Sequence, residues 1–416
     1  MKRIAVIGAG ISGMAAAYYL SRRHETYLFE KDTRLGGHTN TLTVDSSRGP
    51  LPVDTGFIVH NTRNYPNLVR LLQELGVPTE PSDMSFSVHD VHTGFEYSTR
   101  GLRGFFAQSG NALRPGHYRL LGEIHRFNSA ARKLLETPGT EEICLSDFLE
   151  SRRFGAEFTR RYLFPLASSI WSASMAQIGS FPALTLLRFF ENHGMLRLTQ
   201  HITWRTIPGG SQTYIAPLTA PYRERIVTGA KLLGVARHEA GVRLRFADRP
   251  PQDFDEVVLA CHGPQALALL EAPSEGERDV LRHFHTVRNE AVLHTDSNLL
   301  PKTKGARASW NYHLDGDDAR GATLTYHMNR LQSLPVREDY CVSLNANGSV
   351  DRSKIVRRMD YFHPLYTLES VRAQERWAEI SGRDRTHFCG AYWRFGFHED
   401  GLTSAMRVAR ALGVEC

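Results

Sequence analysis

Three glycines near the N-terminus have the spacing of a phosphate-binding loop. Gly8, Gly10 and Gly13 form a G-x-G-x-x-G pattern after a short apolar run. The first glycine permits a tight turn, the second lets a pyrophosphate approach the backbone, and the third lets a helix pack closely on a strand. The N–H groups at the start of that helix, including those of Ile11 and Ser12, attract phosphate. The pattern therefore predicts a dinucleotide-binding site.

The elements around this loop follow the order that such a site requires. Residues 4–7 predict a buried strand, residues 14–23 a helix and residues 26–30 a second strand. Glu30 ends the second strand, where an acid that binds a ribose hydroxyl is expected. An acid there disfavours a 2′-phosphate, so NADP is not expected. The segment also has some features of a signal peptide, but its three glycines favour the strand–loop–helix unit.

Composition indicates a globular protein of two to three domains, since the chain has 416 residues, 41% hydrophobic and 23% charged. The net charge is +6, and no run of five like charges suggests a nucleic-acid binder. Five scattered cysteines without a C-x-x-C pair predict free thiols in a reducing compartment. The 19 histidines show no spacing typical of metal ligands, so no metal is expected.

No stretch is long and apolar enough to predict a transmembrane helix. We therefore expect a cytoplasmic protein, and leave open a peripheral contact with the inner membrane. Apolar side chains flanked by arginines are typical of such a contact with anionic lipid. The first choice for this surface is Arg103, Phe105, Phe106, Leu113 and Arg114.

The residues from Glu30 onward resemble a signature of a known flavoprotein superfamily. Residues 30–38 read E-K-D-T-R-L-G-G-H. This is similar to the E-x(3)-R-x-G-G motif of the flavin-containing amine oxidase, phytoene desaturase and protoporphyrinogen oxidase superfamily. The resemblance implies FAD as the cofactor, with Arg34 at a phosphate and the glycine pair beside the ribityl arm. The superfamily usually has Arg or Lys after this pair, whereas this chain has His38.

Three further segments carry the resemblance. Residues 54–57, D-T-G-F, are similar to an element that brings backbone alongside the isoalloxazine. Residues 232–261 look like returning strands of the FAD domain, with the first residue at the adenine. Residues 388–410 resemble a closing motif, whose helix is expected to start at residues 400–402 beneath the flavin. The cofactor-binding residues implied by the motifs are Gly8, Gly10, Ile11, Ser12, Gly13, Glu30, Lys31, Arg34, Gly36, Gly37, His38, Asp54, Thr55, Gly56, Phe57, Leu232, Cys261, Gly390, Asp400, Gly401 and Leu402.

The expected fold is α/β, a Rossmann-like FAD-binding domain with a discontinuous α+β substrate domain inserted twice. The resemblance implies that residues 1–62, 208–285 and 382–416 form the FAD-binding domain. Residues 63–207 and 286–381 then form the substrate domain. Apolar periodicity predicts helices at 65–75 and 118–135. Strands are expected within 84–98, 290–294, 308–313 and 323–328.

One departure narrows the expected chemistry. Many amine oxidases of this superfamily carry a lysine near the flavin, and the matching residues 288–293 contain none. Residues 56–59, 81–88 and 390–393 look closer to a bacterial branch of predicted NAD/FAD-binding proteins. That branch is associated with cyclopropane-fatty-acid-synthase-like methyltransferases. The resemblance therefore implies an apolar, fatty acyl substrate in place of an amine.

We expect an FAD-dependent oxidoreductase that removes hydride from a long apolar substrate, a fatty acyl or methyl-branched fatty acyl chain. The alternatives are a redox-neutral, FAD-dependent fatty acid double-bond isomerase, a flavin amine oxidase, and a flavin-holding scaffold without turnover. The sequence does not single out a catalytic base, the electron acceptor or the oligomeric state. Imidazoles titrate near neutral pH, so the candidate bases are His60, His193, His313, His327 and His398.

Overall fold

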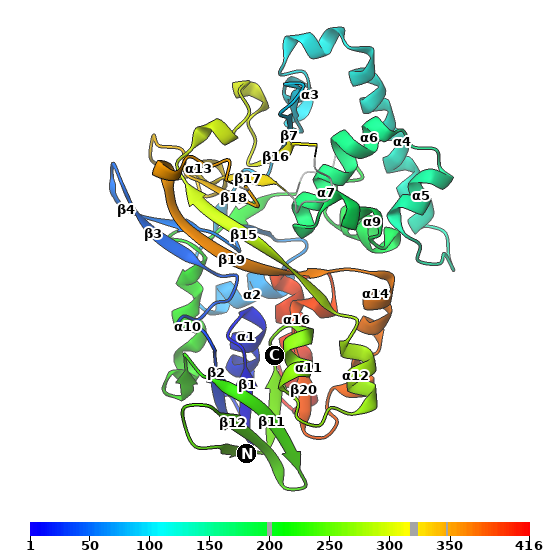
Figure 1. Ribbon diagram of the computed structural model, residues 1–416. Coiled ribbons are helices and arrows are strands. Elements are labelled where there is room, and N and C mark those ends of the chain that lie inside the picture. The colour runs from blue at the N-terminus through cyan, green and yellow to red at the C-terminus, as the bar shows by residue number, and fades with distance from the viewer. Residues whose placement is uncertain (198–201, 317–322, 347) are drawn as a thin grey trace.

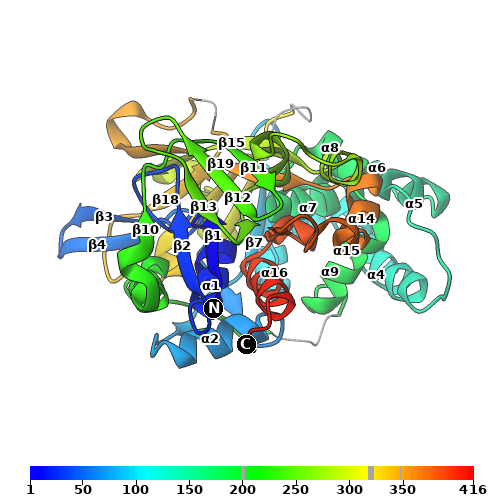
Figure 2. The same ribbon diagram turned by 90° about the horizontal axis from the view of Figure 1, so that it is seen from below.

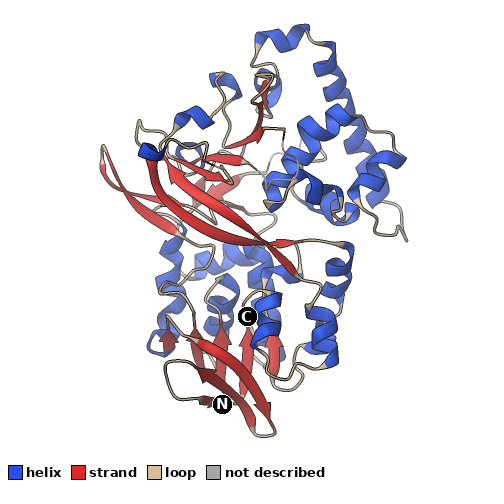
Figure 3. Ribbon diagram, viewed as in Figure 1, coloured by secondary structure: helices blue, strands red, loops and turns tan. Residues whose placement is uncertain are grey.

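The computed structural model describes residues 1–197, 202–316, 323–346 and 348–416. Figure 1 shows two stacked parts, with both termini in the lower part. The lower part is built on a parallel sheet, and the upper part combines a large sheet with a group of helices (Figure 3). Within the described residues, no helix combines the length and apolar character needed to cross a membrane.

The lower part is organised by a five-stranded sheet in which all neighbouring strands are parallel. Its order is β10 (Ile226–Val227), β2 (Glu25–Phe29), β1 (Arg3–Ile7), β14 (Glu256–Leu259) and β20 (Thr386–Phe388). The central strand β1 is apolar and buried, as expected for a strand covered on both faces. The predicted strands near residues 4–7 and 26–30 are therefore confirmed. Because the strands are parallel, their carboxyl ends meet at one edge, where ligands bind in such sheets.

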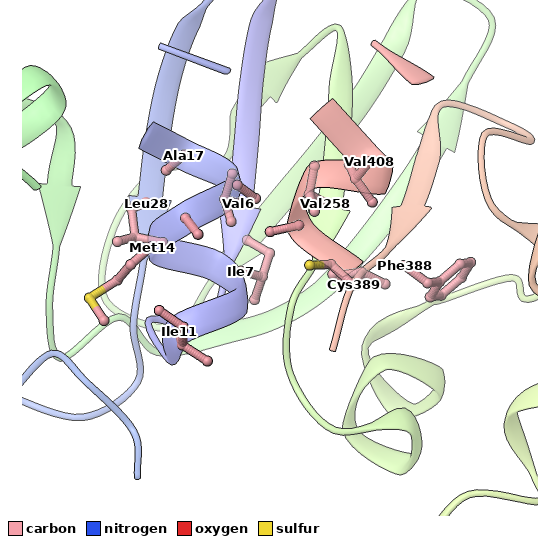
Figure 4. Close-up of a cluster of buried hydrophobic side chains, with 14 of the residues drawn as sticks. Val6, Ile7, Ile11, Met14, Ala17, Leu28, Val258, Phe388, Cys389 and Val408 are labelled. Carbon is pink, nitrogen blue, oxygen red and sulfur yellow. The ribbon is translucent and has the colours of Figure 1, made fainter. Parts of the chain in front are cut away.

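Two helices that are far apart in sequence pack together on one face of this sheet. They are α1 (Ile11–Leu20) and α16 (His398–Ala411). Figure 4 shows Ile11 and Met14 of α1, Val408 of α16 and Val6 of β1 in one apolar cluster. Helix α1 begins three residues before the predicted position 14, because Gly13 fits within its first turn.

A three-stranded antiparallel sheet covers the opposite face of the parallel sheet (Figure 2). It consists of β11 (Leu232–His238), β12 (Gly241–Phe246) and β13 (Gln252–Phe254). The ring of Phe246 lies 5.3 Å from that of Phe29 on β2, so the two sheets share a core. Together with the helices, this sheet buries the parallel strands on both sides.

The upper part contains a seven-stranded sheet. Its order is β19 (Ile355–Leu365), β15 (His285–His294), β18 (Cys341–Leu344), β17 (Leu324–His327), β16 (Trp310–Leu314), β7 (Phe86–Asp90) and β8 (Glu96–Ser98). Only β16 and β7 pair in parallel. The strands predicted within 84–98, 290–294, 308–313 and 323–328 are present. Figure 1 shows the long strands β15 and β19 crossing the molecule where the two parts meet.

Most helices of the upper part come from one continuous segment. They are α3 (Gly101–Phe105), α4 (Pro115–Leu135), α5 (Leu145–Ser151), α6 (Ala156–Phe158), α7 (Phe164–Trp171), α8 (Met175–Gly179) and α9 (Ala183–Asn192). Helix α4 corresponds to the prediction at 118–135. The remaining helices of both parts follow later in the sequence. They are α10 (Ile215–Thr219), α11 (Gly263–Leu269), α12 (Glu275–Leu281), α13 (Met328–Leu331), α14 (Leu368–Glu375) and α15 (Trp377–Ile380).

Short elements connect the two parts. The hairpin of β3 (Thr41–Ser46) and β4 (Gly49–Asp54) precedes a small sheet of β5 (His60–Asn61), β9 (Trp204–Thr206) and β6 (Glu80–Pro81). Helix α2 (Pro66–Glu74), predicted at 65–75, buries Leu68, Leu71 and Leu72. These leucines, and Trp377 of α15, belong to the same core as α1 and the parallel sheet. Segments from both predicted domains therefore contribute to the lower core.

Candidate functional site

The loop between β1 and α1 is shaped by two glycines that touch other backbone. Gly8 has a φ of 103° and donates its N–H to Phe29 O. A Cβ on Gly13 would lie 1.8 Å from Gly8 O, so any side chain there would disrupt the turn. Gly10 is different, because a Cβ added to it would meet no atom within 4 Å. The loop thus leaves open space at the position where a pyrophosphate is expected.

The predicted ribose-binding acid lies directly beside this loop. Glu30 is buried, and its Oε2 accepts the N–H of Ala9 at 2.6 Å, while Oε1 accepts that of Asp32 at 2.9 Å. Lys31 next to it is exposed. The backbone carbonyl of Glu30 accepts the N–H of Ala230, which brings the start of β11 and half-buried Leu232 to the same edge. The acid and the expected adenine contact therefore lie close to one another in the fold.

The second glycine pair crosses the first loop. Gly36 donates its N–H to Ala9 O, and a Cβ on Gly37 would lie 3.1 Å from the Cα of Gly10. The Arg34 guanidinium donates to the carbonyl of Gly37 at 2.8 Å and lies 3.3 Å from that of Thr39. In this structure Arg34 holds the loop closed, and its expected phosphate contact stays a prediction.

The side chain of Asp54, a residue expected at the isoalloxazine, is held by hydrogen bonds from other residues of the protein. Its carboxylate accepts hydrogen bonds from the hydroxyl of Thr41, the N–H and hydroxyl of Ser211 and the amide of Gln332. Burial raises the pKa of Asp54 to about 6. The neighbouring Gly56 has no room for a side chain, since its Cβ would lie 2.2 Å from His38 O. The carboxylate therefore anchors the element formed by residues 54–57, and Thr55 and Phe57 remain on its buried side.

The closing helix begins earlier than the sequence predicted. Helix α16 starts at His398, so Asp400 occupies its third position, and its carboxylate accepts the N–H of Phe397 at 3.0 Å. This capping contact, which turns the acid back toward the preceding residue, is the reason for the difference. A Cβ on Gly401 would lie 2.7 Å from Ser12 Oγ, so α16 crosses the first turn of α1. Leu402 is fully buried in the core.

Two further predicted residues close the edge of the parallel sheet. A Cβ on Gly8 would approach the N of Cys261 to 3.3 Å, which places the end of β14 against the first loop. Gly390, after β20, donates its N–H to the Ser404 hydroxyl of α16. The structure therefore brings the predicted glycines, Glu30, Cys261 and the start of α16 together.

The arrangement fits a bound dinucleotide on two observations. The first is the open space next to Gly10. The flanking Gly8 and Gly13, in contrast, have no room for a side chain. The second is a set of buried polar atoms without a hydrogen-bond partner among the described residues: His38 Nε2 and both ring nitrogens of His60. Buried polar groups are nearly always paired, so such atoms indicate a ligand or water that completes them. The described part of the chain contains no group of three or more His, Cys, Asp or Glu side chains placed to hold a metal ion.

The family pattern described as flavin containing amine oxidoreductase matches residues 11–340. The chain belongs to this family. It is by family an FAD-dependent oxidoreductase, and the prediction of FAD as its cofactor is confirmed. In the flavoprotein, the loop at Gly10 and the crossing pair Gly36–Gly37 are the residues that would hold the pyrophosphate.

Known proteins similar to this flavoprotein differ in their reactions. The 4,4'-diapophytoene desaturase (4,4'-diaponeurosporene-forming) of Staphylococcus aureus is 30% identical over 125 residues, which span 25% of this chain and 24% of the desaturase. The cyclohexylamine oxidase of Brevibacterium oxydans has a TM-score of 0.70 at 14% identity, covering 99% of both chains. The CLA-producing fatty acid isomerase of P. acnes has a TM-score of 0.69 at 16% identity, covering 98% of both. These structural likenesses show the shared fold.

The five candidate histidines have different surroundings. His193 bonds the carbonyl of Phe189 on its own helix, His313 lies beside Thr325 within the sheet, and His327 beside Asp339. His398 Nε2 lies 3.0 Å from Thr39 Oγ1, with the ring stacked on Phe57. His60 is fully buried, and burial lowers its pKa to about 4, which keeps the imidazole neutral. Among the five, His60 is the one whose two ring nitrogens are both buried without a hydrogen-bond partner in the described part of the chain.

Sequence reasoning missed the polar junction beneath the second glycine pair. The Tyr361 hydroxyl of β19 accepts a hydrogen bond from Asn40 Nδ2 at 2.8 Å and lies 2.7 Å from Thr55 Oγ1. The His38 ring stacks on the Tyr361 ring. Tyr361 thus joins the segments at residues 38–40 and 54–57 to the upper sheet. Its alternation with exposed Phe362 on β19 was the signal that it faces inward.

A chain of amides fixes His363, two residues further along β19. The N–H of Glu290 donates to Asn345 Oδ1, so the Asn345 amide donates to Asn289 Oδ1 at 2.7 Å. Asn289 Nδ2 then donates to His363 Nδ1 at 2.9 Å. His363 therefore carries its proton on Nε2. Because Asn289 lies within residues 288–293, this pair of neutral groups occupies the stretch in which the amine oxidase lysine was sought.

Proposed function

We propose that the protein is an FAD-dependent oxidoreductase that desaturates a long apolar substrate, a fatty acyl or methyl-branched fatty acyl chain. The observation that carries this proposal is an aromatic wall beside the start of α16. Phe397 stacks on Phe189 with ring centroids 5.0 Å apart, and Trp171 lies 4.9 Å from Phe189 and 4.5 Å from Phe181. These side chains form an apolar surface of the kind that contacts a hydrocarbon chain.

The neutral pair on β15 and β19 adds support. Asn289 is completely buried, and the pKa of His363 is lowered to about 4, mainly by burial. Arg288, the cation of this stretch, is exposed and pairs with Asp360. The stretch therefore presents no ammonium group on its buried side, which argues against the lysine-assisted chemistry of amine oxidation.

In this proposal, the two expected domains have different roles. Residues 1–62, 208–285 and 382–416 hold the cofactor, and residues 63–207 and 286–381 enclose the substrate. Bound FAD supplies the hydride acceptor. The glycine loops and the N-terminus of α1 bind the pyrophosphate, and the aromatic wall excludes water from the substrate carbon. His60 has no hydrogen-bond partner among the described residues. In the proposal it accepts the proton from the carbon next to the one that loses hydride, and the electrons of that C–H bond form the double bond.

The second candidate function is the redox-neutral double-bond isomerase. It is supported by the likeness over nearly the whole chain to the CLA-producing fatty acid isomerase. The desaturase reading is supported by the partial match to a diapophytoene desaturase. Both candidates place an apolar chain against the same wall, so they differ only in the fate of the hydride.

An anaerobic titration distinguishes these functions. Holoprotein is mixed with fatty acyl substrates that differ in methyl branching and double-bond position, and flavin absorbance is followed with mass spectrometry of the products. Lasting bleaching with a product lighter by two hydrogens supports desaturation. A shifted double bond with oxidised flavin supports isomerisation. Bleaching by small amines alone would overturn both, and no change with any substrate would leave a flavin-holding scaffold.

His60→Gln is the matched variant for the proton acceptor. It keeps a polar group of similar size in the buried site and removes the imidazole. Under the proposal, flavin binding persists and the rate of bleaching falls roughly 100-fold or more. His313→Gln on β16, whose ring lies beside Thr325 within the upper sheet, should leave that rate nearly unchanged.

A further inference from the structure

The end of the molecule opposite the parallel sheet exposes apolar and basic side chains together. Figure 1 shows α3 and the start of α4 at this end. We define the α3–α4 tip as Leu102, Arg103, Leu113, Arg114, Tyr118 and Arg119, all exposed. The segment is folded as one unit, since His117 Nε2 lies 2.7 Å from Phe105 O and the Tyr118 hydroxyl donates to Ala112 O.

The apolar side chains of the tip are unusually open to solvent. Leu113 is 87% exposed, Leu102 68% and Tyr118 52%. Large exposed apolar side chains close together mark contact surfaces more often than isolated ones do. The structure also corrects the surface chosen from the sequence: Phe105 is buried against Tyr97 and His117, and Phe106 is half-buried. The outward-facing apolar residues are their neighbours in the same segment.

The charge on the segments that carry these side chains is predominantly positive. One acid, Glu157, lies at the start of α4, 3.5 Å from a Cβ added to Gly116, and it is paired with Arg161. Residues 97–122 contain four arginines and no Asp or Glu. The 3-10 turn at Lys304–Ala306 packs beside this segment, with Gly305 against Ala107. Residues 297–314 add Lys302, Lys304 and Arg307, again without an acid. Among the described residues, no ion pair neutralises Arg103, Arg114 or Arg119.

We propose that the α3–α4 tip docks on an anionic membrane surface. Cations that ring exposed apolar side chains match a surface with negative headgroups over a hydrocarbon interior. A nucleic acid would use the arginines but gain nothing from Leu102 and Leu113, and so fits the tip less well. The proposal concerns a surface separate from the flavin site, and it stands whether or not the reaction proposed above is correct.

Vesicle flotation of the full-length holoprotein tests the docking. The vesicles are phosphatidylcholine alone, or phosphatidylcholine with about one third phosphatidylglycerol. The protein should float with the anionic vesicles at low salt and much less above about 0.15 M salt. Arg103→Ala with Arg114→Ala should weaken binding roughly 25-fold, at about fivefold for each cation. Leu102→Ser with Leu113→Ser should weaken it several-fold at constant charge.

Matched controls lie at the other end of the molecule. Leu233→Ser removes a leucine that is 58% exposed on β11, and Arg383→Ala removes an exposed arginine before β20. Neither should change flotation, and all variants should keep flavin absorbance and melting temperature. Equal losses from the control and tip variants would overturn the docking site. So would binding that ignores the leucine variants and is equalled on a DNA oligomer, because a general polyanion site would explain it.

Discussion

At Gly10, the fold leaves space where the pyrophosphate of the cofactor is expected to approach the backbone. The φ of −71° and ψ of 180° of this glycine suit any amino acid, and its Cβ direction is empty. We predict that Gly10→Val folds with an unchanged melting temperature and loses most of its FAD, because the valine occupies the pyrophosphate position. Circular dichroism and the flavin absorbance of purified protein measure the two effects.

Gly13→Ala is the contrasting variant. Its Cβ would lie 1.8 Å from Gly8 O, so the loop and the start of α1 must move apart. This variant should lose soluble protein and FAD together. A Gly10→Val protein that keeps full FAD would contradict the assignment of the phosphate loop.

Asp400 gives the molecule a pH-dependent residue at the start of α16. Burial raises its pKa to about 7 from an ordinary value near 4. The folded protein therefore favours the protonated acid, and this contribution to stability is complete below about pH 4 and lost as pH rises through about 7. Asp400→Asn removes the cost of ionisation and keeps an oxygen for the Phe397 N–H.

We predict that Asp400→Asn is more stable than the wild type at pH 8 by roughly 1–4 kcal/mol, at about 1.4 kcal/mol per pKa unit. At pH 4 the two proteins should be nearly equal. Urea unfolding at both pH values measures the difference, in which the shift from Asp54 cancels because both proteins contain it. A difference independent of pH would show that Asp400 does not titrate in this range.

At the scale of elements, the crossing of α1 and α16 decides whether the flavin edge can form. A Cβ on Gly401 would meet Ser12 Oγ at 2.7 Å and Ile11 Cγ2 at 2.9 Å. We predict that Gly401→Ala costs about 1–3 kcal/mol of stability through overpacking, and that Ser12→Ala in the same chain recovers part of it. Thermal unfolding with and without FAD measures both.

The helical Gly276 of α12 supplies the control. Its nearest foreign atom would be 3.8 Å from an added Cβ, an ordinary contact. Gly276→Ala should be neutral or slightly stabilising, because alanine favours helix. If Gly401→Ala behaved in the same way, the close contact of the two helices would be disproved.

At the scale of the whole molecule, Tyr361 links the cofactor loops to the upper sheet. We predict that Tyr361→Phe loses about 1–3 kcal/mol, because the buried Asn40 amide exchanges the hydroxyl for the weak acceptor Met359 Sδ, 3.7 Å away. The affinity for FAD should fall as well, since loops 36–40 and 54–57 are both released. Isothermal titration of apoprotein with FAD measures this. Tyr340→Phe, whose hydroxyl donates to Asp45 O on the outer hairpin, should keep the affinity.

The sequence alone predicted those features that depend on the spacing of nearby residues. The glycines at 8, 10 and 13, the acid at 30 and the pair at 36–37 impose their geometry on adjacent backbone, so motif and strand pattern were sufficient to place them. The predicted start of α16 was wrong by two residues. The same local sequence is compatible with Asp400 as the first residue of the helix and with Asp400 inside the first turn, bonded back to Phe397. Tyr361 with Asn40, and His398 with Thr39, are pairs hundreds of residues apart, and no periodicity in a single chain predicts which partners meet.

The strand order of the parallel sheet also determines when the sheet can be completed during translation. Strand β1 pairs with β14, about 250 residues later, and β14 pairs with β20 near residue 386. Helix α1 packs against α16 only after residues 398–411 have been made. A nascent chain therefore exposes a finished glycine loop on an unfinished sheet until those residues leave the ribosome. We therefore expect flavin to load only after residues 398–411 have been synthesised, and we expect a chain truncated before α16 to lose the cofactor.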